Sequence, residues 1–263
     1  MRTDVLDLHA FYDGSLGATA RGFIEAWLRA AWGEAARLRV AGFGYAAPYL
    51  DLFSAAERVL ALSPAAQGVM RWPDPVEQTG AKNCACLVEE NHWPLPDASI
   101  DRMLIVHGLE ETSEPRRLMR EIWRVLADDG RLIVIAPHRR GLWSMIDSTP
   151  FAAGRPYLKR QLETLFENSM FRARAWGAAL YFPPFAARFM LRAAPAWERA
   201  GGRVWPGFGG VLIAEAEKEL MAPALAADRV RARSAVVVKP SAAIGRSLLR
   251  PENSSPPVKR PAA

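Results

Sequence analysis

Three short groups of residues stand where a parallel sheet would bind a ligand. They directly follow predicted strands and comprise Gly42-Phe43-Gly44, Glu89-Glu90 and His107-Gly108. In open parallel sheets, ligands bind outside the carboxyl ends of the strands. Glycine allows a ligand to approach the backbone, a carboxylate accepts hydrogen bonds from amines and hydroxyls, and histidine can bind a ligand or act as a base. A tight turn, solvated acids and a histidine in the cleft wall are the structural alternatives.

The hydrophobic pattern predicts the elements that position these groups. Helical spacing of apolar residues predicts one or two helices within residues 6–32. Beyond them, apolar runs alternate with helical patterns, which predicts right-handed βαβ units and a parallel sheet. The predicted strands are 36–41, 58–62, 84–88, 102–106, 131–136, 171–180 and 210–216, and the predicted later helices are 45–53, 114–126 and 157–169, with residues 185–199 between the last two strands. The predicted fold is therefore an α/β, Rossmann-like, seven-stranded, mostly parallel sheet with helices on both faces.

The composition favours one large domain followed by a charged tail. Half of the 263 residues are hydrophobic and 24% are charged, so a substantial core can form. Residues 228–263 carry eight basic and two acidic residues, which accounts for the whole net charge of +6. Because the remaining residues are electrically balanced, we expect no binding of nucleic acid by the body of the protein. We predict one domain at 1–239, with a lid insertion between the fifth and sixth strands within 138–200, and a disordered basic, Pro/Ser-rich tail at 240–263.

The two cysteines exclude a disulfide scaffold and indicate a reducing compartment. Cys84 and Cys86 face the same way on a predicted strand, and too few further ligands lie nearby for zinc, so we predict buried free thiols and no metal site. The sequence shows no apolar leader after Met1 and no run of about 20 apolar residues. These features predict a cytoplasmic protein without a transmembrane segment.

A compact basic and aromatic segment follows the fifth predicted strand. It comprises His138, Arg139, Arg140, Gly141, Leu142 and Trp143. Guanidinium groups bind anions in a bidentate manner, so one interpretation is a lid whose His138, Arg139, Arg140 and Trp143 contact an acceptor. The other interpretation is a solvated basic loop anchored by Trp143.

Two longer runs resemble one enzyme family. Residues 93–110, WPLPDASIDRMLIVHGLE, resemble the "LPFPDGSFDVV…HVLEH" run of class I S-adenosylmethionine-dependent methyltransferases of the type 11 kind. Residues 114–126, EPRRLMREIWRVL, resemble the "P…LLREIxRVLKPGG" helix of the same family, and Asp128-Asp129-Gly130 stands where Pro-Gly-Gly is usual. The family's sheet ends in an antiparallel seventh strand, which fits the two late predicted strands.

The resemblance implies S-adenosylmethionine as cofactor and assigns residues to it by position. Gly42 and Gly44 match the glycine loop beside the methionine moiety, and Glu89 falls where the family places a contact to the adenine. His107 matches the residue that flanks the methyl donor. Tyr45 and Ser63, which follow the first and second strands, complete the predicted set. No catalytic residue is assigned by the motif, and His107 and His138 are the candidates.

The sequence departs from the family at two points. The first strand lacks the usual acid and third glycine, and Ala61 stands where an acid normally holds both ribose hydroxyls. Each lost charge-assisted hydrogen bond removes about 1.5–3 kcal/mol. The first hypothesis is methyl transfer to a small acceptor of aromatic or anionic character. The alternative is a catalytically inactive methyltransferase-like protein that binds or regulates a protein partner or forms a homodimer, and it gains support if Phe43 or Tyr45 fills the cofactor site.

Overall fold

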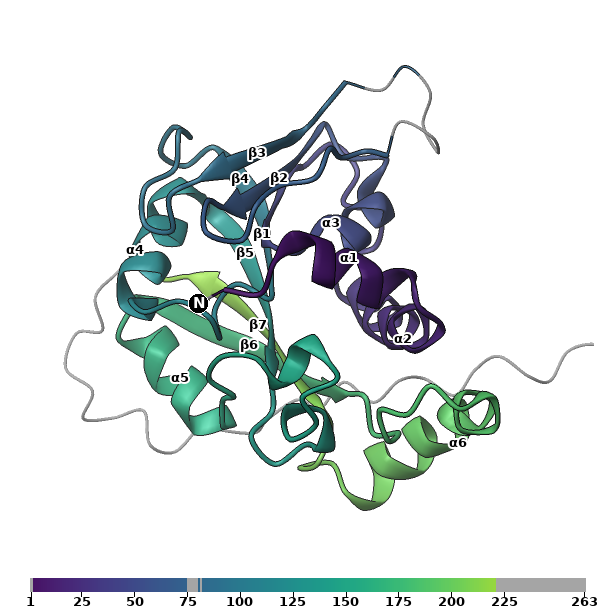
Figure 1. Cartoon of the computed structure of the whole chain (residues 1–263). Helices are drawn as coiled ribbons and strands as arrows, with labels where there is room; N and C mark the ends of the chain where they lie inside the picture. Colours follow the sequence, from purple (N-terminus) through teal and green to yellow (C-terminus); the bar gives the residue numbers. More distant parts are fainter. Residues whose placement is uncertain (1, 75–79, 81, 221–263) are drawn as a thin grey trace, which may run out of the picture.

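The computed structural model describes residues 2–74, 80 and 82–220, and the predicted tail lies outside these residues. Its centre is a seven-stranded sheet in the order β3-β2-β1-β4-β5-β7-β6 (Figure 1). Strands β3, β2, β1, β4 and β5 are parallel, and β7 runs antiparallel to both of its neighbours. The strands are β1 Arg39–Gly44, β2 Arg58–Pro64, β3 Ala85–Val88, β4 Ile100–Val106, β5 Leu126–Pro137, β6 Phe171–Ala179 and β7 Val211–Lys218. The predicted seven-stranded α/β sheet is confirmed.

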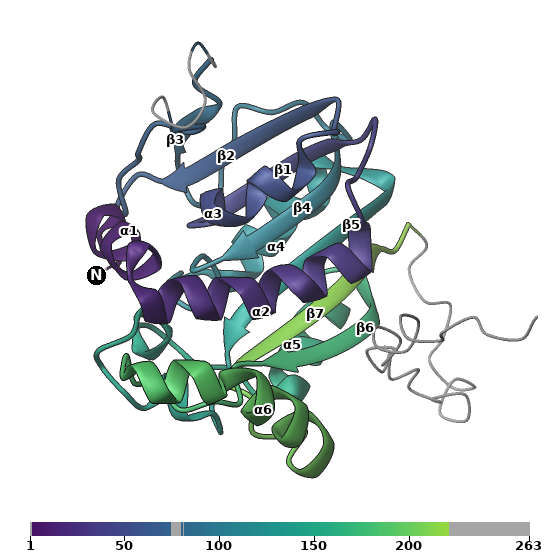
Figure 2. The ribbon, with the colours of Figure 1, turned by 90° about the vertical axis from the view of Figure 1, so that its right-hand side faces the viewer.

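Helices cover both faces of this sheet, as predicted (Figures 1 and 2). The α-helices are α1 Val5–Asp13, α2 Ser15–Trp32, α3 Ala47–Leu50, α4 Pro115–Val125, α5 Lys159–Glu167 and α6 Arg188–Val204; short 3-10 turns are η1 Asp51–Phe53, η2 Leu142–Ser144 and η3 Pro150–Ala152. One hydrophobic core lies between the sheet and α1, α2 and α3. The second core lies under α4 and α5 on the opposite face. Figure 1 shows this division, with α4 and α5 on one side of the sheet and α6 on the side of α2.

Several element boundaries differ from the predicted ones. β1 continues through Gly44, although the sequence predicted a strand that ends before the glycines. β5 begins at Leu126, directly after α4, and its pairing with β4 shifts register between Ile100 and Arg102. The acidic pair Asp128-Asp129 therefore lies within the strand rather than at the end of the helix. The alternation of apolar and polar residues in a sequence cannot reveal such a register shift, because the extra residues at the shift do not follow the alternation.

The predicted insertion at 138–200 is divided by β6 in the structure. Residues 138–170, with η2, η3 and α5, lie between β5 and β6, whereas α6 follows β6. The prediction of buried cysteines was wrong, because Cys84 is half-buried and Cys86 is exposed. β3 has β2 as its neighbour and forms the edge of the sheet, so one side of the strand faces water. No helix among the described residues is long and apolar enough to cross a membrane.

Glu198 holds α6 against the end of β6. Its carboxylate accepts a hydrogen bond from the backbone N–H of Tyr181 at 2.5 Å, and the N–H groups of Leu180 and Phe182 also interact with it. Burial outweighs these donors and raises the pKa of Glu198 to about 7. The folded protein therefore keeps a proton on this carboxyl group at pH values where the unfolded chain has released it.

We expect the free energy of unfolding to decrease by about 2 kcal/mol as the pH rises from 4.5 to 7, because desolvation opposes the ionised Glu198 only in the folded state. Because water still reaches part of the Glu198 side chain, the decrease in the free energy of unfolding is smaller than the pKa shift alone would give. Urea denaturation at a series of pH values measures it. Glu198→Gln is the matched variant. Its free energy of unfolding should not show this decrease between pH 4.5 and 7. Identical pH profiles for the two proteins would contradict the expectation.

Candidate functional site

Two glycines at the end of β1 serve different purposes. A Cβ added to Gly42 would lie 2.5 Å from the Cβ of Ala46, so this glycine allows α3 to pack closely on the strand. Gly44 has a φ of +84°, and a Cβ added there would lie 2.2 Å from the carbonyl oxygen of Val106. Gly44 therefore permits the close approach of β1 to the end of β4, and its bare backbone is open to a pocket on the other side.

This pocket, which we call the cofactor-side pocket, lies at the carboxyl ends of β1 and β2. Its volume is about 150 Å³. Gly44 and Tyr45 line it after β1, and Ala61 and Ser63 line it from β2. The other lining residues come from α1, α2, the α3 region, β3 and the segment after β2: Val5, His9, Tyr12, Asp13, Arg21, Ala47, Pro48, Asp51, Met70, Arg71, Trp72, Asp74 and Ala85.

The walls of the cofactor-side pocket differ in chemistry. Met70 and Trp72 supply an apolar and an aromatic surface, of the kind against which a planar ring packs. Ser63 is buried and offers a hydroxyl at the tip of β2. The remaining wall includes the carboxylates of Asp13, Asp51 and Asp74 and the guanidinium groups of Arg21 and Arg71, so it carries both signs of charge.

Tyr45 forms part of the wall of this pocket and Phe43 does not. The Phe43 ring packs against Trp93, with ring centroids 5.0 Å apart, in the core under α4. The Tyr45 ring stacks on Tyr12 of α1, with centroids 5.5 Å apart and planes inclined by 27°. The two stacked rings narrow the pocket below the volume of about 300 Å³ at which ligand pockets usually begin.

A buried polar network links α1 to the end of β4. The Tyr12 hydroxyl lies 2.9 Å from Nε2 of His107 and accepts a hydrogen bond from the Tyr49 hydroxyl at 3.1 Å. Nδ1 of His107 lies 3.2 Å from the Glu110 carboxylate, and both side chains are buried. His107 also has a φ of +49°, a left-handed conformation that is costly for a residue with a Cβ. Strain of this kind is most often found at functional sites.

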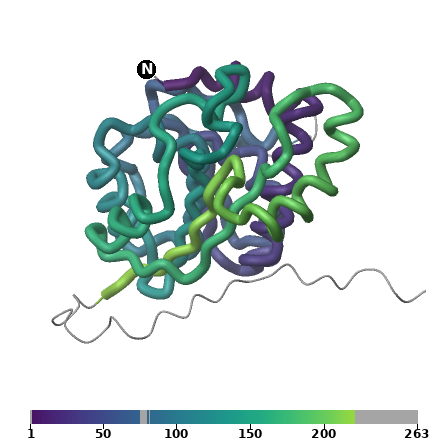
Figure 3. Tube along the Cα trace, turned by 90° about the horizontal axis from the view of Figure 1, so that it is seen from below, coloured from purple at the N-terminus to yellow at the C-terminus, as the bar shows by residue number. Residues whose placement is uncertain are grey.

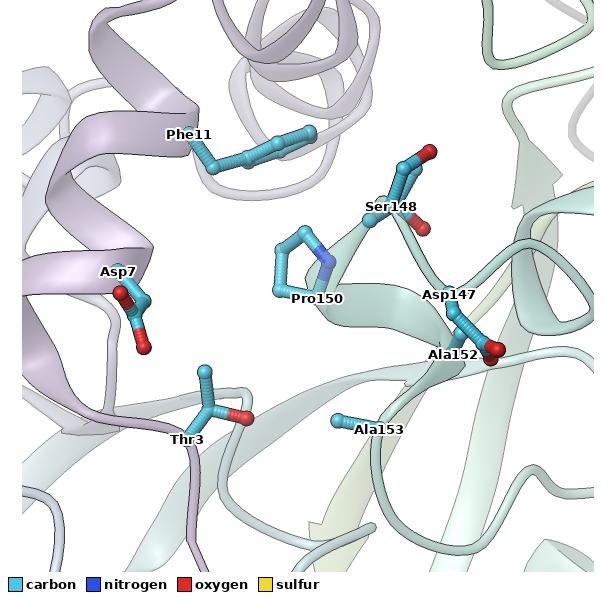
Figure 4. Close-up of a pocket in the computed structure, with 9 residues that line it drawn as sticks. Thr3, Asp7, Phe11, Asp147, Ser148, Pro150, Ala152 and Ala153 are labelled. Carbon is cyan, nitrogen blue, oxygen red and sulfur yellow. The ribbon is translucent and has the colours of Figure 1, made fainter.

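A larger pocket, which we call the acceptor-side pocket, lies across α1 from the first (Figure 4). Its volume is about 370 Å³, within the range of small-molecule sites. It is lined by Thr3, Asp7, Phe11, Asp147, Ser148, Thr149, Pro150, Ala152 and Ala153. Figure 4 shows Asp7 and Phe11 on α1 facing the loop that carries Asp147 and Pro150. Both charged side chains at this pocket are carboxylates.

An aromatic wall separates the two pockets. Phe11 lines the acceptor-side pocket, and the adjacent Tyr12 lines the cofactor-side pocket. The Phe11 ring contacts those of Tyr12 and Phe151, with centroids 5.1 and 6.1 Å apart. The Phe151 ring lies 4.7 Å from that of His107. Helix α1 thus presents one side to each pocket, and its position determines whether the pockets communicate.

A comparison with known protein families matches the region that contains the strand ends at the cofactor-side pocket. A family model described as "Methyltransferase domain" matches residues 40–134. These residues include β1, β2, β3, β4 and α4, together with Gly44, Ser63 and His107. Residues 40–134 are therefore similar to the methyltransferase domain family, over about a third of the chain. The cofactor of this family is S-adenosylmethionine.

Solved structures support the methyltransferase fold over most of the chain. An S-adenosylmethionine-dependent methyltransferase from Thermotoga maritima has a TM-score of 0.58 and 14% identity, covering 82% of this chain and 96% of that one. One from Archaeoglobus fulgidus has a TM-score of 0.52 and 16% identity, covering 75% and 94%. A chain from a complex of the Haloferax volcanii Trm112 methyltransferase activator and a methyltransferase has a TM-score of 0.52 and 12% identity, covering 78% and 97%.

One curated protein matches a short part of the chain. The uncharacterized protein YafS of Escherichia coli strain K12 is 46% identical over 43 residues. The match covers 16% of this chain and 18% of YafS. It therefore adds sequence similarity over a segment and no information on activity.

The predicted cofactor residues of the methyltransferase domain fall into two groups. Gly44, Tyr45 and Ser63 line the cofactor-side pocket, and His107 contacts its wall through Tyr12. Gly42 and Glu89 are not among the residues that line this pocket. Gly42 faces α3, and Glu89 is exposed and pairs with His92 through an isolated bridge at the end of β3.

The predicted acceptor residues lie outside both pockets. Trp143 is fully buried, and its indole N–H donates to the carbonyl of Phe182 at 2.8 Å. His138 is buried, with Nδ1 3.0 Å from the carbonyl of Gly209, and burial lowers the pKa of its imidazole. Arg139 and Arg140 are exposed, and Arg139 donates to the carbonyl of Pro156 at 3.2 Å. The residues of this loop that do line a pocket begin at Asp147.

Sequence reasoning missed the contribution of the N-terminal segment. The Arg2 side chain is buried and donates to Glu90 at 2.6 Å and to the carbonyl of Gly108 at 3.1 Å. Thr3 donates to Glu111 from both its N–H and its hydroxyl. These bonds fix the segment before α1 across the ends of β3 and β4. The helical pattern of α1 was visible in the sequence, but nothing in that pattern shows which strand ends the helix covers.

Proposed function

We propose that the protein transfers the methyl group of S-adenosylmethionine, held in the cofactor-side pocket, to a small neutral or cationic acceptor in the acceptor-side pocket. The observation that carries the proposal is the placement of a pocket at the carboxyl ends of β1 and β2, inside the methyltransferase domain, beside a larger pocket. The carboxyl ends of the first strands are where open α/β sheets bind ligands.

S-adenosylmethionine supplies a methyl group that is already activated on a sulfonium, so the protein's task is to bind and to orient. The bare backbone at Gly44 leaves room for the ligand against β1, and Ser63 offers a hydrogen bond at the tip of β2. Met70 and Trp72 provide the apolar surface for a purine. Alignment of the reacting groups in a site from which water is excluded accounts for much of the rate in such reactions.

The charge of the acceptor-side pocket argues against an anionic acceptor. Asp7 and Asp147 place two carboxylates on opposite sides of it, and the exposed Arg139 and Arg140 lie outside its lining. An amine fits this charge: it can bind as the cation, but its nitrogen must release that proton to water before it accepts the methyl group, and the Phe11 ring provides an apolar or cation–π contact. An acceptor with its own carboxylate would be repelled.

The His107 network is suited to receive the proton that a neutral N–H or O–H acceptor loses on methylation. His107 is buried, but its Nε2 contacts the Tyr12 hydroxyl, which lines the cofactor-side pocket, so the acceptor must reach past Phe11 to Tyr12 for this transfer. The buried Glu110 side chain lies 3.2 Å from Nδ1 on the other side of the ring. Tyr12 stays a neutral phenol, because burial raises its pKa well above the ordinary value. We assign His107 as the base, with Tyr12 as its link to the pocket.

Calorimetry with S-adenosylmethionine and S-adenosylhomocysteine tests the cofactor site. We expect micromolar binding of at least one of them. Ala85→Trp places an indole in the small pocket and should weaken binding at least about tenfold, as expected for a blocked pocket. Cys86→Trp is the matched control, since the adjacent side chain on β3 points to the other side of the strand and is exposed. Formation of S-adenosylhomocysteine with a panel of small amines, phenols and carboxylic acids then tests the acceptor class.

The alternative is a methyltransferase-like protein without activity, which binds or regulates a partner. One observation favours it: Ala61, at the position of the ribose acid, lines the pocket, and the stacked Tyr12 and Tyr45 narrow it. Absence of heat with either ligand at millimolar concentration would support this alternative and overturn the proposed enzyme.

A further inference from the structure

Helix α6 contacts the body of the protein through a narrow stripe and is otherwise exposed or half-buried. It has 17 residues, of which only Ala194 and Gly201 are buried. These two small residues lie seven positions apart, which is two helical turns, and so define a narrow contact stripe. A Cβ added to Gly201 would lie 2.4 Å from the Tyr181 side chain, so the helix packs closely along this stripe. Figures 2 and 3 show α6, in green, at the periphery of the molecule.

Large apolar side chains are exposed along α6 and at both of its ends. Phe189, Trp197 and Val204 have exposed fractions of 71%, 41% and 60%. Their spacing of eight and seven residues places them on one side of the helix. Phe185 before the helix and Trp205 and Phe208 after it are also more than half exposed, at 53%, 55% and 56%. We call these six residues the α6 apolar surface.

A row of arginines runs beside this surface. Arg188, Arg192, Arg199 and Arg203 are all exposed, and their spacing of four, seven and four residues places them on one side of α6. Within the part of the chain that the structure describes, none of the four forms a salt bridge. The acidic residue of the helix, Glu198, is turned inward against the end of β6. The outward half of α6 is therefore apolar on one side and purely cationic on the other.

We propose that α6 binds the surface of an anionic lipid bilayer and lies in its plane. A helix of this kind buries its aromatic and aliphatic side chains at the boundary between headgroups and acyl chains, while its arginines contact anionic headgroups. Tryptophan and phenylalanine are well suited to that boundary. A folded protein partner with an acidic, apolar groove is the competing occupant. The bilayer is favoured because both stripes run along the whole helix and the apolar one continues beyond its ends. This inference does not depend on the proposed enzymatic activity.

Flotation of the full chain with vesicles tests the proposal. We expect binding to phosphatidylcholine vesicles that contain about 30% phosphatidylglycerol and weaker binding to phosphatidylcholine alone. Phe189→Ser with Trp197→Ser should reduce the partition coefficient at least tenfold. Arg192→Gln with Arg199→Gln should reduce the partition coefficient about tenfold. The difference between this variant and the parent should become smaller at high salt. All variants keep residues 221–263, so any contribution of the basic tail is common to them.

Matched variants elsewhere on the surface provide the controls. Leu6→Ser with Leu87→Ser removes two exposed apolar side chains, and Arg116→Gln with Arg120→Gln removes two exposed charges from α4. Both should bind vesicles like the parent, and circular dichroism should show the same melting temperature for all. Equal binding by the α6 variants and the parent would overturn the proposal, as would no vesicle binding by the parent. A parent dimer that the α6 substitutions convert to a monomer in size-exclusion chromatography, without vesicle binding, would assign the surface to a second copy instead.

Discussion

Ala61→Asp should increase the affinity for S-adenosylmethionine by about 10- to 100-fold. Ala61 lines the cofactor-side pocket from β2, at the position where the family places the acid that holds the ribose. A carboxylate there can accept two charge-assisted hydrogen bonds from the ribose hydroxyls, each of which contributes about 1.5–3 kcal/mol. Desolvation of the carboxylate and its repulsion by Asp51 offset part of this gain. Calorimetry on the parent and the variant measures the difference.

Two further variants separate a specific ribose contact from a general electrostatic effect. Ala61→Asn has the same shape without the charge and should gain little. Ala85→Asp adds the same charge to the same pocket from β3, whose Ala85 is the register partner of Ala61. The sulfonium is cationic, so a non-specific field would strengthen binding in both aspartate variants. An equal gain for Ala85→Asp and Ala61→Asp would show that the acid does not act through the ribose.

The sequence predicted the sheet well because its signals are local. Continuous apolar runs such as 102–106 can be recognised without knowledge of the rest of the chain, and β4 contains that run. The same holds for Gly44 and Ser63, whose place in the pocket follows from their position at strand ends. Parallel strands bring their carboxyl ends to one edge. A local pattern is therefore sufficient to place these residues.

The parts of the site that depend on long-range packing could not be predicted. Tyr12 and His107 are 95 residues apart in sequence, and their contact follows from the docking of α1. Trp143 follows a basic segment in the sequence, and both a surface anchor and a core residue fit that context. The structure buries Trp143 because the backbone of Gly210 leaves room for its ring, where a Cβ would lie 2.4 Å from it. That complementary space is formed by a segment 67 residues further along the chain.

The small side chain of Ala61 in β2 and the docking of α1 together shape the cofactor-side pocket. Without the acid at position 61, ribose recognition has to come from other groups of the pocket. Tyr12 and Tyr45 occupy part of the remaining space, and the Tyr12 hydroxyl is bonded to His107. Since the pocket has a volume of only about 150 Å³, we expect α1 to shift when a ligand of the cofactor's size binds. The affinity of such a ligand is lowered by the free energy of that shift.

Gly44→Ala should destabilise the protein by about 3–5 kcal/mol. Two effects add at this position. The φ of +84° costs a residue with a Cβ about 1–2 kcal/mol, and the new methyl group would lie 2.2 Å from the Val106 carbonyl oxygen and 2.9 Å from the amide nitrogen of Gly108. These atoms belong to the backbone at the end of β4, which is held by its pairing with β1 and β5, so they cannot move away cheaply. Urea denaturation measures the loss.

Gly80→Ala separates the cost of the positive φ from the cost of the close backbone contact. Gly80 has nearly the same φ, +82°, but no heavy atom of the described residues lies within 4 Å of an added Cβ. The Gly80→Ala variant should therefore lose only the free energy that the left-handed backbone conformation costs, about 1–2 kcal/mol. The difference between the two variants reports the close approach of β1 to β4, on which the shape of the cofactor-side pocket depends. If Gly44→Ala costs no more than Gly80→Ala, the end of β1 relaxes readily, and Gly44 cannot be the residue that fixes the backbone beside the ligand.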